Sequence, residues 1–272
     1  MWDAKSREKV SKFKAHYSWI QALDVSPDGT KIATGSGCDE TAHVWPLPTG
    51  GQLLDLQHKD IRTIRFSPNG RLLAYGSLAP LRIHDSQNGR FLTDFQIYAW
   101  SLAWVSDSAQ LFVLSADDIY CLEVSSGMTL STWSIRLEHE KSYRISLSSN
   151  GAFIAVKAKS LVSFQDTHTH QQIGTVVHRG DSVYSMAMSA HYDFVVGGEE
   201  EITSWNLRDV LPPRYVNAGV SGSASKSRSV QLQNAHRKDT SQPLPARDEH
   251  SSLFVHYLPL FLSHFVEQTK DL

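Results

Sequence analysis

The histidines are the side chains of this sequence best suited to chemistry. Thirteen are present, and imidazole is both a common metal ligand and a common general base. His168 and His170 stand closest together, but no further ligand follows them at a spacing that would complete a metal site. The three glutamates at 199–201 form a run of like charges that is typical of a solvated loop. We therefore expect no metal site and no cofactor.

Motifs that carry catalysis are also missing. The sequence has no Gly-x-Ser-x-Gly elbow, no phosphate-binding glycine loop and no pair of catalytic carboxylates. Cys38 and Cys121 lie far apart and match no zinc spacing, so they favour a reducing, intracellular compartment, cytoplasmic or nuclear. No stretch approaches the roughly 20 apolar residues of a membrane span. A net charge of −2 gives no reason to expect nucleic acid as a partner. A non-enzymatic protein is expected.

A repeat of about 40 residues organises the chain. Residues 26–29 read Ser-Pro-Asp-Gly and residues 67–70 read Ser-Pro-Asn-Gly, and weaker versions of this tetrapeptide begin at 105, 148 and 189. Asp-Gly and Asn-Gly are strong signals for tight turns, because the glycine adopts a positive φ at little cost. Alternating apolar residues flank each turn, which predicts a series of antiparallel hairpins.

A third short strand follows each hairpin and a fourth follows in the first four units, and no helical periodicity separates the strands. Four antiparallel strands in each unit of about 40 residues are typical of a propeller blade. The sequence therefore predicts an all-β fold, a β-propeller of five four-stranded blades over residues 1–211.

Residues 1 to about 211 resemble the WD-repeat propellers, as shown by the Ser-Pro-Asp-Gly turns, by loop histidines such as His58 and by closing pairs such as Trp205-Asn206. The resemblance implies a structural tetrad of hydrogen-bonded side chains in the first repeat, formed by His16, Thr34, Asp39 and Trp45. In the second repeat His84 stands where the tryptophan belongs and Leu78 lies near the place of the aspartate. Later repeats are equally eroded, so we expect those blades to depend more on apolar packing.

The fifth unit contains only three strands. One hypothesis is that residues 9–13 provide its fourth strand by pairing with residues 201–207, which would close the ring and remove an exposed sheet edge. The alternative is that the chain is a piece of a longer propeller. Beyond the repeats, residues 212–251 are rich in serine and predict a disordered linker. Residues 252–272 form a short apolar segment, with a docked helix or an erroneous chain end as the two alternatives.

One position of the repeat, five residues before the start of each turn, predicts a surface that binds a partner. By the family resemblance it lies at the top of the first strand, and it is occupied mostly by arginine and aromatic side chains, which dominate binding energy at many interfaces. Packing between blades is the competing interpretation. We expect a scaffold that works within a complex and binds a protein or peptide on this top face; a regulatory propeller from a larger signalling protein is the alternative. The predicted surface residues are Gln21, Arg62, Trp100, Tyr143 and Tyr184 at this position, together with Trp19 in or beside the same top loops.

Overall fold

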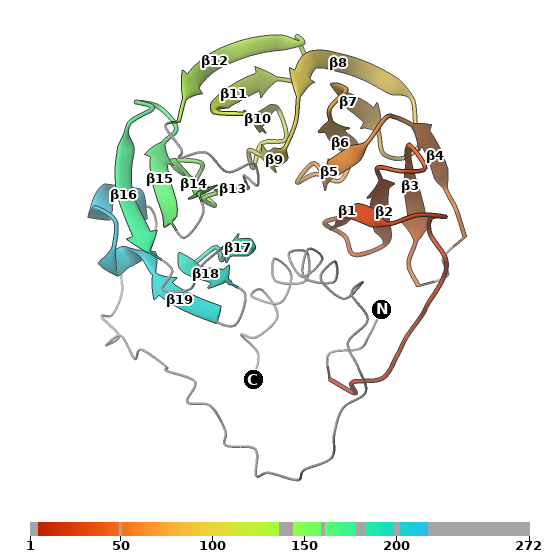
Figure 1. The fold of residues 1–272 in the computed structure, drawn as a ribbon, viewed down its shortest axis with the longest axis horizontal. Helices are drawn as coiled ribbons and strands as arrows, with labels where there is room; N and C mark the ends of the chain where they lie inside the picture. Colours follow the sequence, from red (N-terminus) through yellow and green to blue (C-terminus); the bar gives the residue numbers. More distant parts are fainter. Residues whose placement is uncertain are drawn as a thin grey trace, which may run out of the picture.

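Short antiparallel strands make up almost all of the described structure, a computed structural model that covers residues 5–48, 51–135, 144–158, 161–177, 183–198 and 202–216. The strands form five sheets that follow one another in sequence order around an arc (Figure 1). Four sheets have four strands, and the fifth has three among the described residues. Within each sheet the strands pair in chain order, with the first strand innermost. The prediction of an all-β propeller with five blades is confirmed.

The strand bounds follow the repeat. Blade 1 consists of β1 (Ile20–Val25), β2 (Lys31–Ser36), β3 (Thr41–Pro46) and β4 (Leu54–Gln57), and blade 2 of β5 (Ile61–Phe66), β6 (Leu72–Ser77), β7 (Pro80–Asp85) and β8 (Phe91–Tyr98). Blade 3 consists of β9 (Ser101–Trp104), β10 (Gln110–Ser115), β11 (Asp118–Glu123) and β12 (Met128–Ser134). Blade 4 consists of β13 (Ile145–Leu147), β14 (Phe153–Ala158), β15 (Leu161–Asp166) and β16 (Gln172–Val177). Blade 5 contains β17 (Ser185–Met188), β18 (Asp193–Gly197) and β19 (Ile202–Asn206).

The first hairpin of blade 1 shows why the repeated tetrapeptide forms a turn. The Ser26 hydroxyl donates to the Asp28 carboxylate and accepts a hydrogen bond from the backbone N–H of Lys31 at 2.9 Å. Gly29 has a φ of 68°, in the left-handed region that glycine adopts without strain. Ser67, Asn69 and Gly70 repeat the arrangement in blade 2. The turn is therefore specified by local hydrogen bonds, independently of the neighbouring blades.

The apolar core is divided into four clusters, each lying between two successive blades. Both faces of an inner blade are buried in this way, because alternate residues of a strand point to opposite faces and each face meets a different neighbour. In β6, for example, Leu73 and Tyr75 join the cluster with blade 1, whereas Ala74 joins the cluster with blade 3. This burial of two faces explains why single blades are not stable alone and why they stack around an axis.

Polar side chains also tie the inner strands of neighbouring blades together. The Asp24 carboxylate on β1 accepts a hydrogen bond from the backbone N–H of Phe66 on β5 at 2.8 Å. The Ser101 hydroxyl on β9 accepts one from the backbone N–H of Ile145 on β13 at 3.2 Å. Innermost strands have one edge without a neighbouring strand, so these side chains satisfy backbone groups that the sheets leave unpaired.

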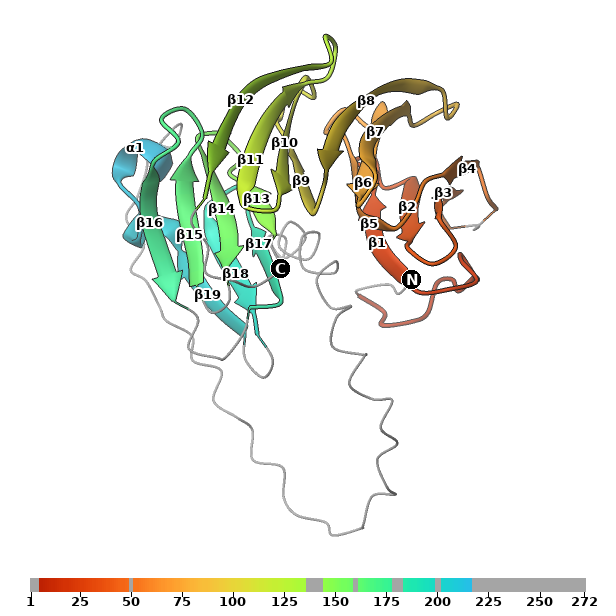
Figure 2. The same ribbon diagram turned by 45° about the horizontal axis from the view of Figure 1, so that its top comes forward.

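The hypothesis that residues 9–13 pair with the fifth blade is not supported by the described residues. β19 is the last strand of its sheet, and both views place the segment before β1 beside blade 1 (Figures 1 and 2). The Phe13 ring packs against Trp45 of blade 1 at a centroid distance of 5.2 Å. His16, three residues further on, is hydrogen-bonded to Thr34 of the same blade at 2.9 Å, so the chain just before it is held at blade 1.

The described chain continues past the boundary expected at residue 211, to Val216. A short 3-10 helix, η1 (Leu207–Asp209), and α1 (Pro213–Val216) place buried side chains in the core cluster between blades 4 and 5. The Tyr215 hydroxyl donates a hydrogen bond to the Asp166 carboxylate, and its carbonyl oxygen accepts one from the Asn150 side chain at 3.0 Å. The remaining residues of the expected linker and the apolar segment at 252–272 lie outside the described residues.

In the described ranges, no helix has the length and apolar character needed to cross a membrane.

A candidate interaction surface across the first three blades

Two of the predicted surface residues occupy β-bulges at the start of an inner strand. The pairing register of β1 shifts between Ile20 and Ala22, and that of β5 shifts between Ile61 and Thr63. Gln21 and Arg62 are the extra residues at these shifts. A bulge takes a residue out of the regular ladder and redirects its side chain, which is why bulges recur beside functional sites. Both side chains lie at the end of the blade opposite the Ser-Pro-Asp-Gly turns.

Arg62 lies between a carboxylate and an aromatic ring. Its Nε donates to the Asp60 carboxylate at 2.9 Å, and its guanidinium lies 5.5 Å from the ring centroid of Trp100 on blade 3. The same Asp60 oxygen accepts a hydrogen bond from the Ser77 hydroxyl at 3.0 Å. Asp60 itself has a left-handed backbone, with a φ of 47°. The guanidinium therefore sits in one position while remaining partly exposed, with a side-chain exposure of 43%.

Gly37 continues this network into blade 1. A Cβ at this position would lie 2.5 Å from Gln21 Oε1 and 2.6 Å from Asp60 Oδ1, so the glycine backbone runs directly against both side chains. Gln21 Oε1 is buried and has no hydrogen-bond partner within the described residues. A larger residue at 37 would push the blade 1 loop away from Asp60.

Large apolar side chains are exposed around the same edge. Four of them keep more than half of their surface in contact with solvent, and they all lie in loops or strand ends of blades 1 and 2: Tyr17, Trp19, Leu78 and Tyr98. The Tyr17 backbone N–H donates to the Asp39 carboxylate at 3.0 Å, which fixes its loop, and Lys14 lies over its ring at 4.4 Å. Tyr98 pairs with Pro80 and therefore stands beside the turn that carries Leu78.

We call this group the aromatic rim, defined as Tyr17, Trp19, Arg62, Leu78, Tyr98 and Trp100. The contacts that join it run from the Tyr17 loop through Gly37 and Asp60 to blade 3. Isolated apolar side chains are normal on protein surfaces, whereas a contiguous group is a common sign of an interaction site.

The structure brings four of the six predicted surface residues into this region: Trp19, Gln21, Arg62 and Trp100. Tyr184 immediately precedes β17 of blade 5, two blades further along the arc from Trp100. Tyr143 lies outside the described residues. The repeat alignment did not identify Tyr17, Asp60 or Leu78 as surface residues, because they lie in loops where alternation carries no signal. Leu78 was noted only as a replacement for an aspartate.

The four side chains of the proposed tetrad meet at the edge of blade 1. His16 Nε2 and Thr34 Oγ1 are 2.9 Å apart, and Trp45 Nε1 donates to the same hydroxyl at 2.9 Å. His16 Nδ1 lies 3.2 Å from the Asp39 carboxylate. His43 stacks on His16 with ring centroids 4.5 Å apart. Burial lowers the pKa of His16, and the neighbouring His43 adds to this effect. The network anchors the loop that carries Tyr17.

Blade 2 forms a different set of contacts at the equivalent place. The Tyr75 hydroxyl lies 3.1 Å from His84 Nδ1, and both side chains are buried. Burial lowers the pKa of His84 to about 4, with a smaller contribution from the charge of Arg82. His58, which has no aspartate partner, lies 2.7 Å from the carbonyl oxygen of Pro80 and 2.9 Å from that of Lys59. Backbone carbonyls thus replace the missing carboxylate.

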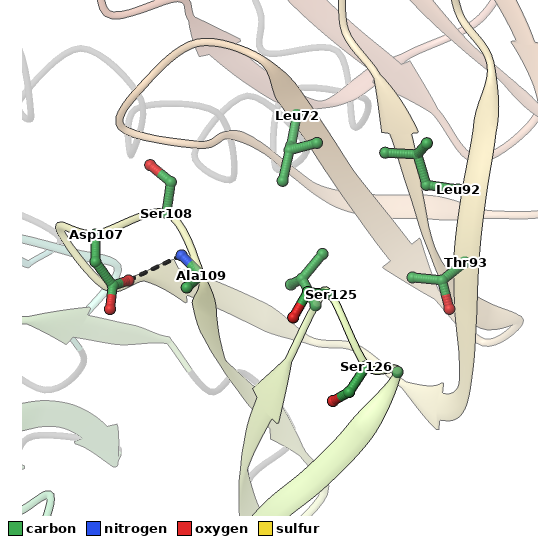
Figure 3. A pocket seen from close by; sticks show the side chains of 10 residues that line it. Leu72, Leu92, Thr93, Asp107, Ser108, Ala109, Ser125 and Ser126 are labelled. Atoms are coloured by element: carbon green, nitrogen blue, oxygen red, sulfur yellow. Dashed lines mark hydrogen bonds between the residues drawn. The ribbon is translucent and has the colours of Figure 1, made fainter.

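A groove of about 600 Å³ lies between blades 2 and 3 on the opposite face (Figure 3). Leu72 and Leu92 line one side, and the turn around Ser125 lines the other. Its carboxylate, Asp107, accepts a hydrogen bond from the backbone N–H of Ala109 at 2.8 Å and so serves the turn rather than a ligand. The groove has fewer anchoring groups than the aromatic rim.

No cluster of three or more histidine, cysteine, aspartate or glutamate side chains suited to a metal ion occurs in the described part of the chain.

Comparisons with known proteins identify the repeat. The family model of the WD domain, G-beta repeat, matches residues 7–46, the segment that contains all four tetrad residues. The small ribosomal subunit protein RACK1y of Oryza sativa subsp. japonica is 28% identical over 123 residues, which are 41% of this chain and 36% of that protein. The U3 small nucleolar RNA-associated protein 21 of Saccharomyces cerevisiae is 40% identical over 73 residues, 26% of this chain and 8% of that protein.

The similarity thus covers about a third of the first relative and less than a tenth of the second. It falls on a chain whose described residues form five successive antiparallel blades, the first of which joins histidine, threonine, aspartate and tryptophan side chains through hydrogen bonds. Residues 7–46 therefore contain a WD repeat, and the described residues form a β-propeller of five blades.

Proposed function

We propose that the protein is a non-catalytic scaffold that binds a protein or peptide through the aromatic rim. The observation that carries this proposal is the Arg62–Trp100 pair, which lies at the same end of the blades as the exposed rings of Trp19 and Tyr98. Arginine, tryptophan and tyrosine are the residues that most often dominate binding energy at interfaces.

Arg62 is well prepared for binding. Asp60 and Trp100 already restrict its side chain, so less conformational entropy is lost when a partner docks. The aromatic rings have few rotatable bonds and large contact areas, which favours them in the same way. A partner with an apolar anchor that fits between the rings, and an acceptor group for the guanidinium, suits this surface.

The names of the two relatives support membership in an assembly. One is named as a protein of the small ribosomal subunit and the other as associated with a small nucleolar RNA. From these names we infer only that the chain works within an intracellular complex, which is cytoplasmic or nuclear.

The test compares the proteins recovered with the full chain and with the double variant Arg62→Ala/Trp100→Ala, by quantitative affinity purification from the source cells. We expect the double variant to recover at least tenfold less of each specific partner than the wild-type chain does. Arg208→Ala is a matched control, because Arg208 makes a similar contact with the Tyr192 ring, at 5.8 Å, beside a turn of the opposite face. Circular dichroism confirms that each variant is folded. Equal recovery of all partners by the double variant would refute the proposal.

A further inference from the structure

The first and the last blade of the arc each have one face on which no described sheet packs. The four core clusters lie between successive blades, and none of them joins blade 5 to blade 1 in the described ranges. Both views show these two blades at opposite ends of the arc (Figures 1 and 2). The stacking that buries both faces of an inner blade is therefore incomplete at these two ends.

The face of blade 1 that points away from blade 2 is nevertheless apolar. Leu23 and Val25 lie two residues apart on β1, and Val25 pairs with Ile32 on β2, so the three side chains share this face. We call them the open face of blade 1. All three remain half-buried. The equivalent positions of blade 2 are no more than 5% exposed, because blade 1 packs on them: Ile64, Phe66 and Leu73.

This comparison indicates that the open face is built to be covered. The repeat places core side chains at the same positions in both blades, but only blade 2 has a preceding blade among the described residues. Apolar surface of this kind gains free energy when another apolar surface removes it from water.

Blade 5 presents a flatter face at the other end of the arc. Ala187 of β17 pairs with Val195 of β18, and both point away from Phe194, which lies in the cluster with blade 4. Ile202 on β19 shares this face and is 65% exposed. Apart from Ile202 these side chains are small, so they leave space for bulky side chains opposite them.

One segment outside the described residues has the composition to cover such faces. Residues 253–266 contain no lysine, arginine, aspartate or glutamate, and most of them are aliphatic or aromatic. Apolar side chains occupy odd positions, such as Leu253 and Val255, and even positions, such as Phe254 and Leu258. They therefore cannot all lie on one face of a single regular element. A segment that is apolar on all sides is buried between two surfaces rather than laid on one.

The chain leaves the described structure near this end of the arc. Val216 ends α1 and lies in the core cluster between blades 4 and 5, where the Tyr215 carbonyl oxygen accepts a hydrogen bond from Asn150 at 3.0 Å. Residues 217–252 connect this point to the apolar segment. A flexible chain of this length spans about 30 Å, whereas stacked sheets lie about 10 Å apart. The connection is therefore long enough to pass blade 5.

We propose that residues 253–266 pack on the open face of blade 1, with the exposed face of blade 5 as the opposite wall. The segment then covers Leu23, Val25 and Ile32 as blade 1 covers their counterparts in blade 2. It acts as an apolar plug at the two ends of the arc. The proposal does not depend on the aromatic rim.

The first test is photo-crosslinking in the full chain, with a benzophenone-bearing amino acid in place of Phe261. We expect mass spectrometry to find crosslinks within one chain to peptides that contain β1 or β2. The same amino acid at Gln233, among the connecting residues, is the matched control and should give at least tenfold less of these crosslinks. The proposal is overturned if position 261 yields no crosslink to β1 or β2, or if these crosslinks join two copies of the chain.

The second test measures how fast a thiol on the open face reacts with a maleimide. Val25→Cys places a thiol there, in a chain from which Cys38→Ser has removed the exposed native thiol. We expect Leu258→Asp/Phe261→Asp to accelerate this reaction at least tenfold, because a charged segment no longer packs on the face. Leu232→Asp, among the connecting residues, is the matched control and should leave the rate unchanged.

An unchanged labelling rate at position 25 in the double aspartate variant would also overturn the proposal. Cys121, which is buried on β11, reports whether that variant is still folded, because it should stay unlabelled. Should Cys121 react as fast as the introduced thiol, the chain has unfolded and the crosslinks from position 261 decide the question.

Discussion

Acidification should destabilise blade 2 through His84. This histidine is buried, it lies 3.1 Å from the Tyr75 hydroxyl, and its pKa is lowered from 6.5 to about 4, mainly by burial. A histidine with a lowered pKa in the folded state is neutral there while the unfolded chain takes up a proton. The associated stability is present above pH 6.5 and is lost as the pH falls toward 4.

The magnitude follows from the pH interval. Each pKa unit corresponds to about 1.4 kcal/mol. Between pH 6.5 and pH 5, a span of about 1.5 units, His84 should remain neutral in the fold and lower the free energy of unfolding by about 2 kcal/mol. The pKa values of His16 and His58 are also lowered, mainly by burial, so they add a pH dependence of the same sign.

The assay is urea unfolding at pH 7.5 and pH 5 for the wild type and His84→Asn, in which an amide oxygen remains to accept from Tyr75. The variant should be less stable at pH 7.5 because the site becomes underpacked. Its further loss between the two pH values should nevertheless be about 2 kcal/mol smaller than that of the wild type. His191→Asn, at an exposed histidine, is the control and should keep the wild-type dependence. An unchanged pH dependence in His84→Asn would refute the reasoning.

Two further substitutions test the packing of blade 1. Thr34→Val removes the oxygen that accepts a hydrogen bond from Trp45 Nε1, so a buried donor loses its partner. We expect chemical denaturation to show that the free energy of unfolding falls by about 2 to 4 kcal/mol. A decrease below about 0.5 kcal/mol would contradict the role given to this hydroxyl. Gly35→Ala would place a Cβ 2.3 Å from Ile61 Cγ2 at the contact between blades 1 and 2, so we expect a loss of about 1 to 3 kcal/mol in the same assay. Gly51→Ala meets nothing within 4 Å and should be neutral; equal effects of the two glycine substitutions would argue against the contact.

The blade architecture could be predicted from the sequence because its signals are local. The Ser26–Gly29 turn is held by hydrogen bonds among residues five or fewer positions apart, and alternation assigns each strand residue to a face without reference to the rest of the chain. The tetrad positions came from the resemblance to the WD-repeat family rather than from the strand pattern. Their hydrogen bonds in the structure join residues of a single repeat.

The position of the segment before β1 could not be decided in this way. Residues 9–13 have the pattern of a fourth strand, and pairing with blade 5 was a reasonable expectation. The contact between Phe13 and Trp45 instead places the end of this segment at blade 1, where the hydrogen bonds of His16 hold the adjoining chain. Likewise, a Pro-Pro pair marks the end of the repeats, but not the burial of Tyr215 against blades 4 and 5 beyond it.

The sequence by itself determined the five units and their hairpins, since short-range hydrogen bonds and a two-residue period specify them; the network of the first blade was implied by the family resemblance. Only the tertiary structure decided which exposed side chains gather. Arg62 reaches Trp100 because a bulge redirects it and because blades 2 and 3 stack face to face. Such contacts depend on how the blades are arranged around their common axis, and no local pattern encodes that arrangement.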